Sequence, residues 1–125
     1  MSDDTRVVVV DDDADFRLLM RVQLDLVDGL TVVGVAGDGI EAVEVVRRER
    51  PDAVVMDLLM PKMNGFEAIQ SIRESDPGIG IVAYTAVAGN YAREQTAAMG
   101  VELVLKSGDP TDLVEAIARS REAAT

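Results

Sequence analysis

Five residues whose side chains can do chemistry stand at the ends of short apolar runs in the 125-residue chain. They are three carboxylates, a hydroxyl and an ammonium: Asp11, Asp12, Asp57, Thr85 and Lys106. Crowded carboxylates repel one another, and a cation among them relieves that repulsion. Oxygen ligands favour Mg²⁺ or a similar hard ion. We therefore expect a metal ion held by Asp11, Asp12 and Asp57.

The same residue types suit a reaction at phosphorus. Asp57 would act as a carboxylate nucleophile and form an acyl phosphate. The metal ion would neutralise charge that develops during the transfer, Lys106 would pair with one phosphoryl oxygen, and Thr85 would donate a hydrogen bond to another. Asp57, Thr85 and Lys106 are therefore the candidate catalytic residues.

Two absent residue types exclude other kinds of chemistry. The chain has no cysteine, which excludes disulfides, thiolate metal sites and cysteine nucleophiles. It has no histidine either, which excludes imidazole zinc sites, Ser–His catalysis and a phosphohistidine carrier role. Any reaction here must use carboxylates, hydroxyls, lysines and a bound metal.

The chain is strongly acidic, with 12 basic and 23 acidic residues, a net charge of −11 and a pI of about 4.3. Such a surface argues against direct contact with nucleic acid. It suits a cation, or a partner with a basic face. The acidic start Met1-Ser2-Asp3-Asp4 is unlike a secretory signal, and the apolar stretch 78–89 is too short to cross a bilayer. We expect no membrane contact and a cytoplasmic location.

The apolar runs predict the elements that position these residues. They are rich in Val, Ile and Leu and mostly lack alternation: Val7–Val10, Val32–Ala36, Ala53–Met56, Ile81–Tyr84 and Val101–Leu105. Continuous runs of this kind are typical of parallel strands covered on both faces. Segments with helical spacing lie between them. Phe16, Leu19, Met20 and Val27 share one side of the first segment, and Leu113, Val114, Ile117 and Ala118 share one side of the last.

Strand and helix alternate five times without a break in composition. This pattern predicts a three-layer, doubly wound α/β domain with a five-stranded parallel sheet and right-handed crossovers. We expect one domain over residues 1–125, with its core at about 6–120. Since the carboxyl ends of parallel strands meet at one edge, this fold would bring the candidate residues together.

Helix starts are marked by capping residues. Asp38 and Asn64 each stand three residues before a glutamate, a variant of the capping box. Asp109 is followed by Pro110, an N-cap followed by proline at the first helical position.

Each candidate residue also has a simpler interpretation. Acidic runs usually mark an exposed helix start, and we keep that interpretation for Asp13 and Asp15. A calcium loop is excluded because its glycine and terminal glutamate are replaced by Phe16 and Val22. Asp57 alone could simply end a strand, Thr85 is more often a turn residue, and Lys106 more often a solvated charge. The functional interpretation depends on their joint placement at one sheet edge.

Four motifs in this order resemble those of the response-regulator receiver domain of bacterial two-component signalling. They are Val10-Asp11-Asp12-Asp13, Val55-Met56-Asp57-Leu58-Leu59-Met60-Pro61-Lys62-Met63-Asn64-Gly65, Tyr84-Thr85-Ala86 and Leu105-Lys106. The second motif is highly specific, and the resemblance covers nearly the whole chain, from Val7 to about Ala118. It implies the flavodoxin-like strand order 2-1-3-4-5.

The resemblance implies a role for each matching residue. Asp57 corresponds to the phosphoacceptor, which takes phosphate from a sensor histidine kinase or a phosphotransfer protein. Asp11 and Asp12 correspond to the acidic pair that holds Mg²⁺ together with Asp57, and the backbone carbonyl of Leu59 to the usual third protein ligand.

Two further matching residues link the reaction to a switch. Thr85 corresponds to the switch hydroxyl and Lys106 to the ammonium that pairs with the phosphoryl group. Phosphorylation would reshape a surface made of Tyr91, Arg93, Leu103 and residues of the last helix. That surface would contact an output domain, a partner protein or a second copy of the chain.

Three positions depart from the family pattern. Leu103 stands where the family often has an aromatic switch residue. Ser107 replaces the proline that often follows the lysine, as in regulators with a helix-turn-helix output domain, so an N-terminal place in a transcriptional regulator is one arrangement the resemblance allows. Val87 lies two residues after Thr85 and cannot orient an attacking water, which predicts a long-lived phosphorylated form.

The leading hypothesis is a phosphorylatable receiver that assists its own phosphorylation but has no turnover on a free substrate. A Mg²⁺-dependent phosphohydrolase is one rival, but its usual Asp-x-Asp-x-Thr/Val pattern is not matched, because Asp15 follows Ala14. A receiver-like interaction module that does not need phosphate is the other. Leu103 supports that rival, while the retained acceptor, acidic pair and lysine oppose it.

Overall fold

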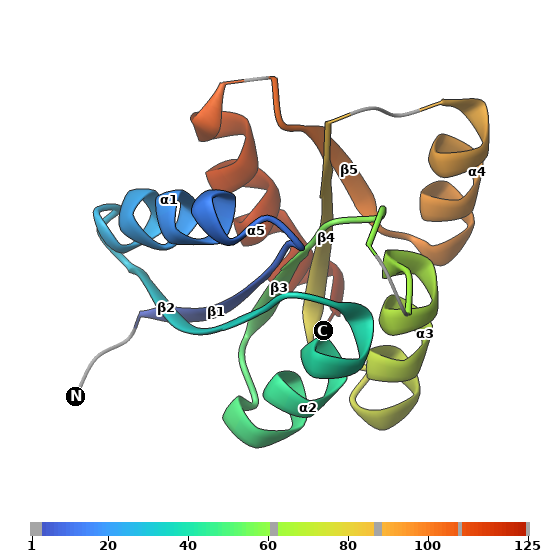
Figure 1. Cartoon of the computed structure of the whole chain (residues 1–125), viewed down its shortest axis with the longest axis horizontal. Helices are drawn as coiled ribbons and strands as arrows, with labels where there is room; N and C mark the ends of the chain where they lie inside the picture. The colour runs from blue at the N-terminus through green and yellow to red at the C-terminus, as the bar shows by residue number, and fades with distance from the viewer. Residues whose placement is uncertain (1–3, 61–62, 87–88, 108, 125) are drawn as a thin grey trace.

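The five apolar runs form the strands of a single parallel sheet. The computed structural model describes residues 4–60, 63–86, 89–107 and 109–124. The strands are β1 (Thr5–Val10), β2 (Leu30–Ala36), β3 (Ala53–Met56), β4 (Gly80–Thr85) and β5 (Glu102–Leu105). Every neighbouring pair is parallel, and the order across the sheet is β2-β1-β3-β4-β5 (Figure 1). The predicted fold class and strand order are therefore confirmed.

Five helices cover the two faces of this sheet. They are α1 (Ala14–Asp25), α2 (Gly39–Glu49), α3 (Gly65–Ser75), α4 (Asn90–Met99) and α5 (Pro110–Ala124). Helices α1 and α5 pack on one face, and α2, α3 and α4 pack on the other (Figure 1). The result is the three-layer arrangement that alternating strands and helices require.

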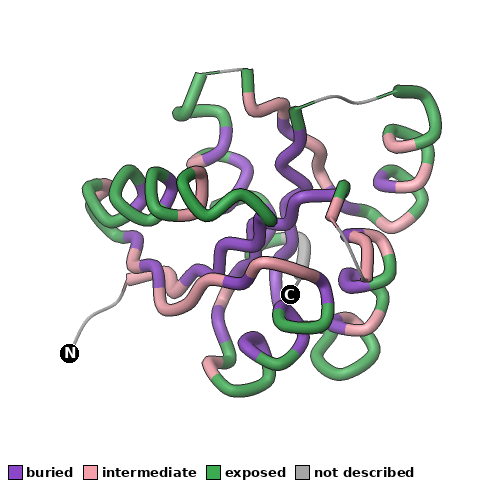
Figure 2. The backbone as a smooth tube through the Cα atoms, in the orientation of Figure 1, coloured by how far each residue is buried: buried purple, intermediate pink, exposed green. Residues whose placement is uncertain are grey.

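Alternate residues of the central strands supply the two cores. Val7 and Val9 of β1 pack under α1 and α5, whereas Val8 and Val10 pack under α2 and α3. All four valines are at most 1% exposed. Burial on both faces explains why this strand is a continuous run of β-branched residues (Figure 2).

The predicted helix starts are present. The Asp38 side chain accepts a hydrogen bond from the Glu41 N–H at 2.8 Å, and Asn64 accepts one from the Glu67 N–H at 3.0 Å. Asp109 accepts one from the Thr111 N–H at 2.9 Å, with α5 beginning at Pro110. Each cap satisfies a backbone donor that the first helical turn leaves without a partner.

The face predicted for the first helix is partly wrong. Leu19 is 50% exposed, and the buried side chains of α1 are Met20 and Leu24. Figure 2 shows the exposed colour along most of this helix. The helix is also shorter than the pattern suggested: α1 ends at Asp25, so Val27 lies outside it.

Two differences from the predicted runs concern the burial of β2 and the end of β4. Four of the seven residues of the edge strand β2 are half-buried, because only one neighbouring strand pairs with it. Thr85 is the last residue of β4 rather than the residue after it. Within the described ranges, no helix combines the length and apolar character needed to cross a membrane.

Candidate functional site

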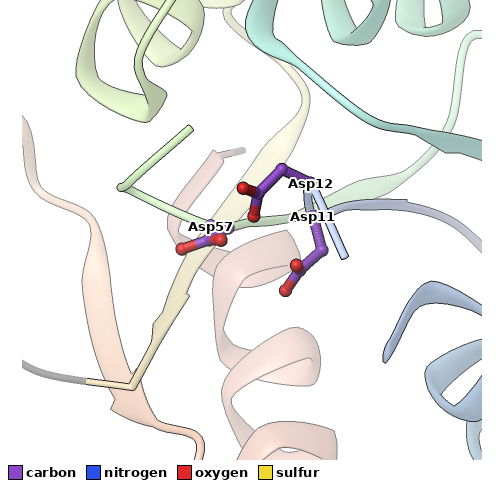
Figure 3. A group of neighbouring side chains, drawn as sticks. All are labelled: Asp11, Asp12 and Asp57. Carbon is purple, nitrogen blue, oxygen red and sulfur yellow. The ribbon is translucent and has the colours of Figure 1, made fainter. Parts of the chain in front are cut away.

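Three carboxylates meet at the carboxyl edge of the sheet. Asp11 and Asp12 follow β1, and Asp57 follows the neighbouring β3. One carboxylate oxygen from each lies within 4.8 Å of the others, and Figure 3 shows the side chains turned toward a common space. We call this group the acidic pocket. Asp11 and Asp57 are buried and Asp12 is exposed, so the pocket opens to solvent on one side.

Backbone hydrogen bonds to neighbouring strands hold the main chain of two of these residues. The Asp11 N–H donates to the Ala36 carbonyl of β2 at 3.0 Å, and the Asp57 N–H donates to the Val10 carbonyl of β1 at 3.0 Å. The Asp11 carboxylate also accepts the Asp13 N–H at 2.9 Å. Two buried carboxylates are therefore placed by the ladder itself rather than by a flexible loop.

Lys106 supplies the positive charge of the site. Its ammonium donates to the Asp11 carboxylate and lies 3.6 Å from Oδ2 of Asp57. Its backbone N–H donates to the Thr85 carbonyl at 2.9 Å, which joins the end of β5 to the end of β4. The Lys106 side chain is only 19% exposed, so its attraction to both carboxylates is weakly screened.

Burial and neighbouring charges shift the acidity of the site. Burial raises the pKa of the Asp57 carboxyl, and the nearby Asp11 and Asp12 charges raise it further. Lys106 and the N–H of Leu59, which donates to Asp57 Oδ1 at 3.3 Å, act in the opposite direction. Burial prevails, so the ionised form of Asp57 is less favourable here than in water.

The donor set fits a divalent hard cation. Three carboxylates face one ammonium among these four side chains, which leaves an excess of negative charge in a partly buried space. All the ligand atoms are oxygens, the type that Mg²⁺ prefers, and the exposed Asp12 side leaves room for water ligands. The arrangement thus satisfies the charge and ligand requirements of Mg²⁺.

The remaining candidates lie at the same edge. Thr85 is buried at the end of β4, next to the strand that carries Asp57. Leu59 lies two residues after Asp57, and its side chain is 69% exposed. The use of the Leu59 carbonyl as a metal ligand and of the Thr85 hydroxyl as a phosphoryl partner stay predictions.

Three residues that support the site were not singled out as functional from the sequence. A Cβ atom at Gly65 would lie 2.3 Å from the Asp57 carbonyl oxygen, so glycine lets α3 pack against the backbone of Asp57 and Leu58. The Arg17 guanidinium donates to the Asp11 carbonyl at 2.7 Å. The Phe16 ring lies beneath the Lys106 ammonium. The only available signal was the position of Gly65 within the second motif.

Residues of the predicted switch surface line two different grooves. Arg93 and Leu103 line a groove with Glu102 and Arg119, next to β5 and α5. Tyr91 lies elsewhere, because its ring packs edge-on against Phe66 of α3, with ring centres 5.8 Å apart.

Tyr91 instead lines a groove between α3 and α4. Tyr91 is also an exposed residue of α4, so its part in the predicted switch surface stays a prediction. Ser107 is exposed after Lys106. Pro61, Lys62 and Val87 lie outside the described residues.

Known proteins share this sequence pattern. The family model for the response regulator receiver domain matches residues 7–118. The chain is 37% identical over 116 residues to the chemotaxis protein CheY of Thermotoga maritima, covering 90% of this chain and 93% of that protein. It is 44% identical over 92 residues to a protein-glutamate methylesterase/protein-glutamine glutaminase of Geobacter metallireducens, covering 74% of this chain and 25% of that protein. The match thus spans about a quarter of this longer relative.

Solved structures agree with the fold. The response regulator domain of Thermotoga maritima CheB has a TM-score of 0.86 at 28% identity, covering 95% of this chain and 97% of that one. A LuxR-family two-component response regulator from Aurantimonas sp. has a TM-score of 0.89 at 34% identity, covering 96% and 86%. With the acidic pocket at the position expected for a phosphoacceptor site, the chain belongs to the response regulator receiver domain family.

Proposed function

We propose that Asp57 accepts a phosphoryl group from the phosphohistidine of a sensor histidine kinase or a phosphotransfer protein. The observation that supports this most is the meeting of Asp11, Asp12 and Asp57 with Lys106 at one sheet edge. An Asp57 oxygen forms a bond to phosphorus as the phosphorus–nitrogen bond breaks. The imidazole leaves with that electron pair and takes up a proton.

Asp11, Asp12 and Asp57, together with the Leu59 carbonyl, would hold Mg²⁺. When bound, this ion neutralises charge on the transferring group. Lys106 contacts Asp11 and Asp57, which supports a role in which its ammonium would pair with a phosphoryl oxygen on Asp57. Thr85, at the end of the adjacent strand, would donate a hydrogen bond from its hydroxyl to another phosphoryl oxygen.

The new charge on Asp57 would act as a switch rather than as part of a catalytic cycle. Thr85 and Lys106 are joined by a backbone hydrogen bond, so a shift of either residue reaches β5 and the groove of Arg93 and Leu103. That groove would contact an output domain, a partner protein or a second copy of the chain. Turnover on a free substrate is not part of the proposal. The proposal includes a cytoplasmic location, because an ATP-dependent kinase must supply the phosphohistidine.

Intact-protein mass spectrometry tests the acceptor. The protein is incubated with Mg²⁺ and phosphoramidate, a small donor that carries the same phosphorus–nitrogen bond as phosphohistidine. The wild type should gain one phosphoryl group, and chelation of Mg²⁺ should abolish the gain. Asp57→Asn should gain none. Asp28→Asn makes the same chemical change at an exposed residue of the turn after α1 and should behave as the wild type.

Two results would overturn the proposal. A phosphoryl group found on Asp57→Asn would place the acceptor elsewhere. No gain by a folded wild type, with either phosphoramidate or acetyl phosphate, would favour the interaction module that works without phosphate. In that case the groove of Arg93 and Leu103 would be the first surface to examine for an unmodified partner.

A further inference from the structure

We propose that Phe16 is a positioning residue for Lys106, whose ammonium it holds at the acidic pocket through a cation–π contact. The Lys106 Nζ atom lies over the Phe16 ring, 4.3 Å from its centre. This inference rests on the proposed phosphoryl transfer to Asp57. It gives a residue of the first turn of α1 a part in a reaction carried out by groups at the ends of four strands.

The Phe16 ring is itself held in place from the sheet. It makes a tilted contact with the ring of Tyr84, with the two centres 6.1 Å apart. Tyr84 is 6% exposed within β4, so it provides a fixed surface behind Phe16. The ring therefore connects α1, β4 and the residue that follows β5, all at the edge where Asp57 lies.

The chemistry of this contact suits the task of Lys106. A lysine side chain is a flexible four-carbon stem with three hydrogen-bond donors at its end. An aromatic face attracts the positive charge without supplying a carboxylate that would compete for those donors. The ammonium can thus stay anchored over Phe16 while its N–H groups point to Asp11 and, after transfer, to a phosphoryl oxygen on Asp57.

The position of the ammonium makes the contact effective. The Lys106 side chain is 19% exposed and lies between the ring and two buried carboxylates. Cation–π contacts strengthen as the cation loses water. A leucine at position 16 would fill similar space but would lack the negative ring face. The proposal therefore predicts an effect of ring electrons, separate from an effect of side-chain volume.

A fluorinated series separates these two effects. Phenylalanine with one, two or three ring fluorines is placed at position 16; fluorine withdraws electrons from the ring face with little change in size. Phosphorylation of Asp57 by phosphoramidate is timed at saturating Mg²⁺. The rate constant should fall stepwise with fluorine number, by roughly 3- to 10-fold in total. The rate constant of Phe16→Leu should be lower by a similar factor, whereas that of Phe16→Tyr should stay within about twofold of the wild type.

Two controls distinguish positioning from structural damage. Mg²⁺ affinity, measured by calorimetry, should change less than about twofold across the series, because a neutral ring contributes little to a carboxylate site. The same fluorinated series at Phe66, whose ring packs against Tyr91, should leave the rate unchanged. A rate at position 16 that is independent of fluorine number would refute the proposal. So would an equal dependence at position 66.

A spectroscopic test keeps an aromatic ring at position 16 and changes Lys106 instead. The chain has two phenylalanines, so uniform labelling with 4-fluorophenylalanine gives two fluorine resonances. Lys106→Met removes the ammonium and should shift the Phe16 resonance more than the Phe66 resonance; equal shifts would refute the contact. This measurement uses the unphosphorylated protein. A wild type that fails to accept phosphate would instead refute the proposed function, and the two failures are thus distinguished.

Discussion

Replacing Gly65 by alanine should destabilise the domain and distort the backbone at Asp57 and Leu58. Gly65 is the first residue of α3, and its N–H donates to the Leu58 carbonyl at 3.1 Å. An added Cβ would lie 2.3 Å from the Asp57 carbonyl oxygen and 2.6 Å from the Leu58 Cα. Both are backbone atoms, so neither can rotate away, and either the helix or the loop must move.

The size of the effect follows from two opposing contributions. Overpacking costs about 3 kcal/mol where rigid atoms must move, the upper end of the usual range. Alanine gains at most about 1 kcal/mol over glycine from helix propensity. A net loss of about 2 kcal/mol remains. With an unfolding entropy of about 0.26 kcal/mol/K for a chain of 125 residues, Tm should fall by about 8 °C.

Thermal unfolding followed by circular dichroism measures this change. Gly89→Ala is the matched control, because Gly89 has an ordinary φ of −84° and a Cβ there would meet nothing within 4 Å. Its Tm should stay within about 4 °C of the wild type, since the loss of an N-cap glycine costs at most about 1 kcal/mol. An unchanged Tm for Gly65→Ala would refute the argument from close approach.

Three further outcomes are expected. Asp57→Asn should have a higher Tm than the wild type at pH 8 in chelator. Burial raises the folded pKa of Asp57, so the wild type loses stability as pH rises through that pKa, and the difference in Tm should disappear toward pH 4. A lower Tm of Asp57→Asn at pH 8 would contradict this. Asn64→Ala removes the cap of α3 and should lower Tm by about 4 °C, while Asn64→Asp should not. Added Mg²⁺ at one hundred times its Kd should stabilise the folded wild type by about 2.7 kcal/mol and so raise its Tm. Asp11→Asn should abolish most of that rise in Tm.

Much of the architecture was predictable because its physical causes are local in sequence. A run such as Val7–Val10 is explained by burial on both faces of a central strand, and the caps at Asp38 and Asn64 act within one helical turn. The meeting of Asp11 with Asp57 follows from any parallel sheet that pairs β1 with β3. The strand order itself came from the family resemblance, because periodicity does not determine which strands are neighbours.

The errors arose where several arrangements satisfy the same pattern. Helix α1 and its C-cap carry two apolar stripes. Met20 and Leu24 are buried, while Leu18, Val22 and the C-cap Leu26 repeat every four residues and are each more than half exposed. Helical spacing alone cannot choose between them.

The contact of Phe16 with Lys106 was also beyond reach, because it joins residues from opposite ends of the chain. Similarly, the direction of the Tyr91 ring depends on Phe66 in another helix.

Helix α4 is held much more loosely than its neighbours. Thr96 is its one buried residue, and Gly89 gives its first turn no side-chain cap. Elements with little buried apolar surface open locally at a small fraction of the free energy needed to unfold the whole domain. The amide protons of α4 should therefore exchange with solvent through openings that leave the sheet intact, and faster than those of the strands beneath α5. Hydrogen exchange would then identify α4 as a segment that reorders while the rest of the domain stays folded.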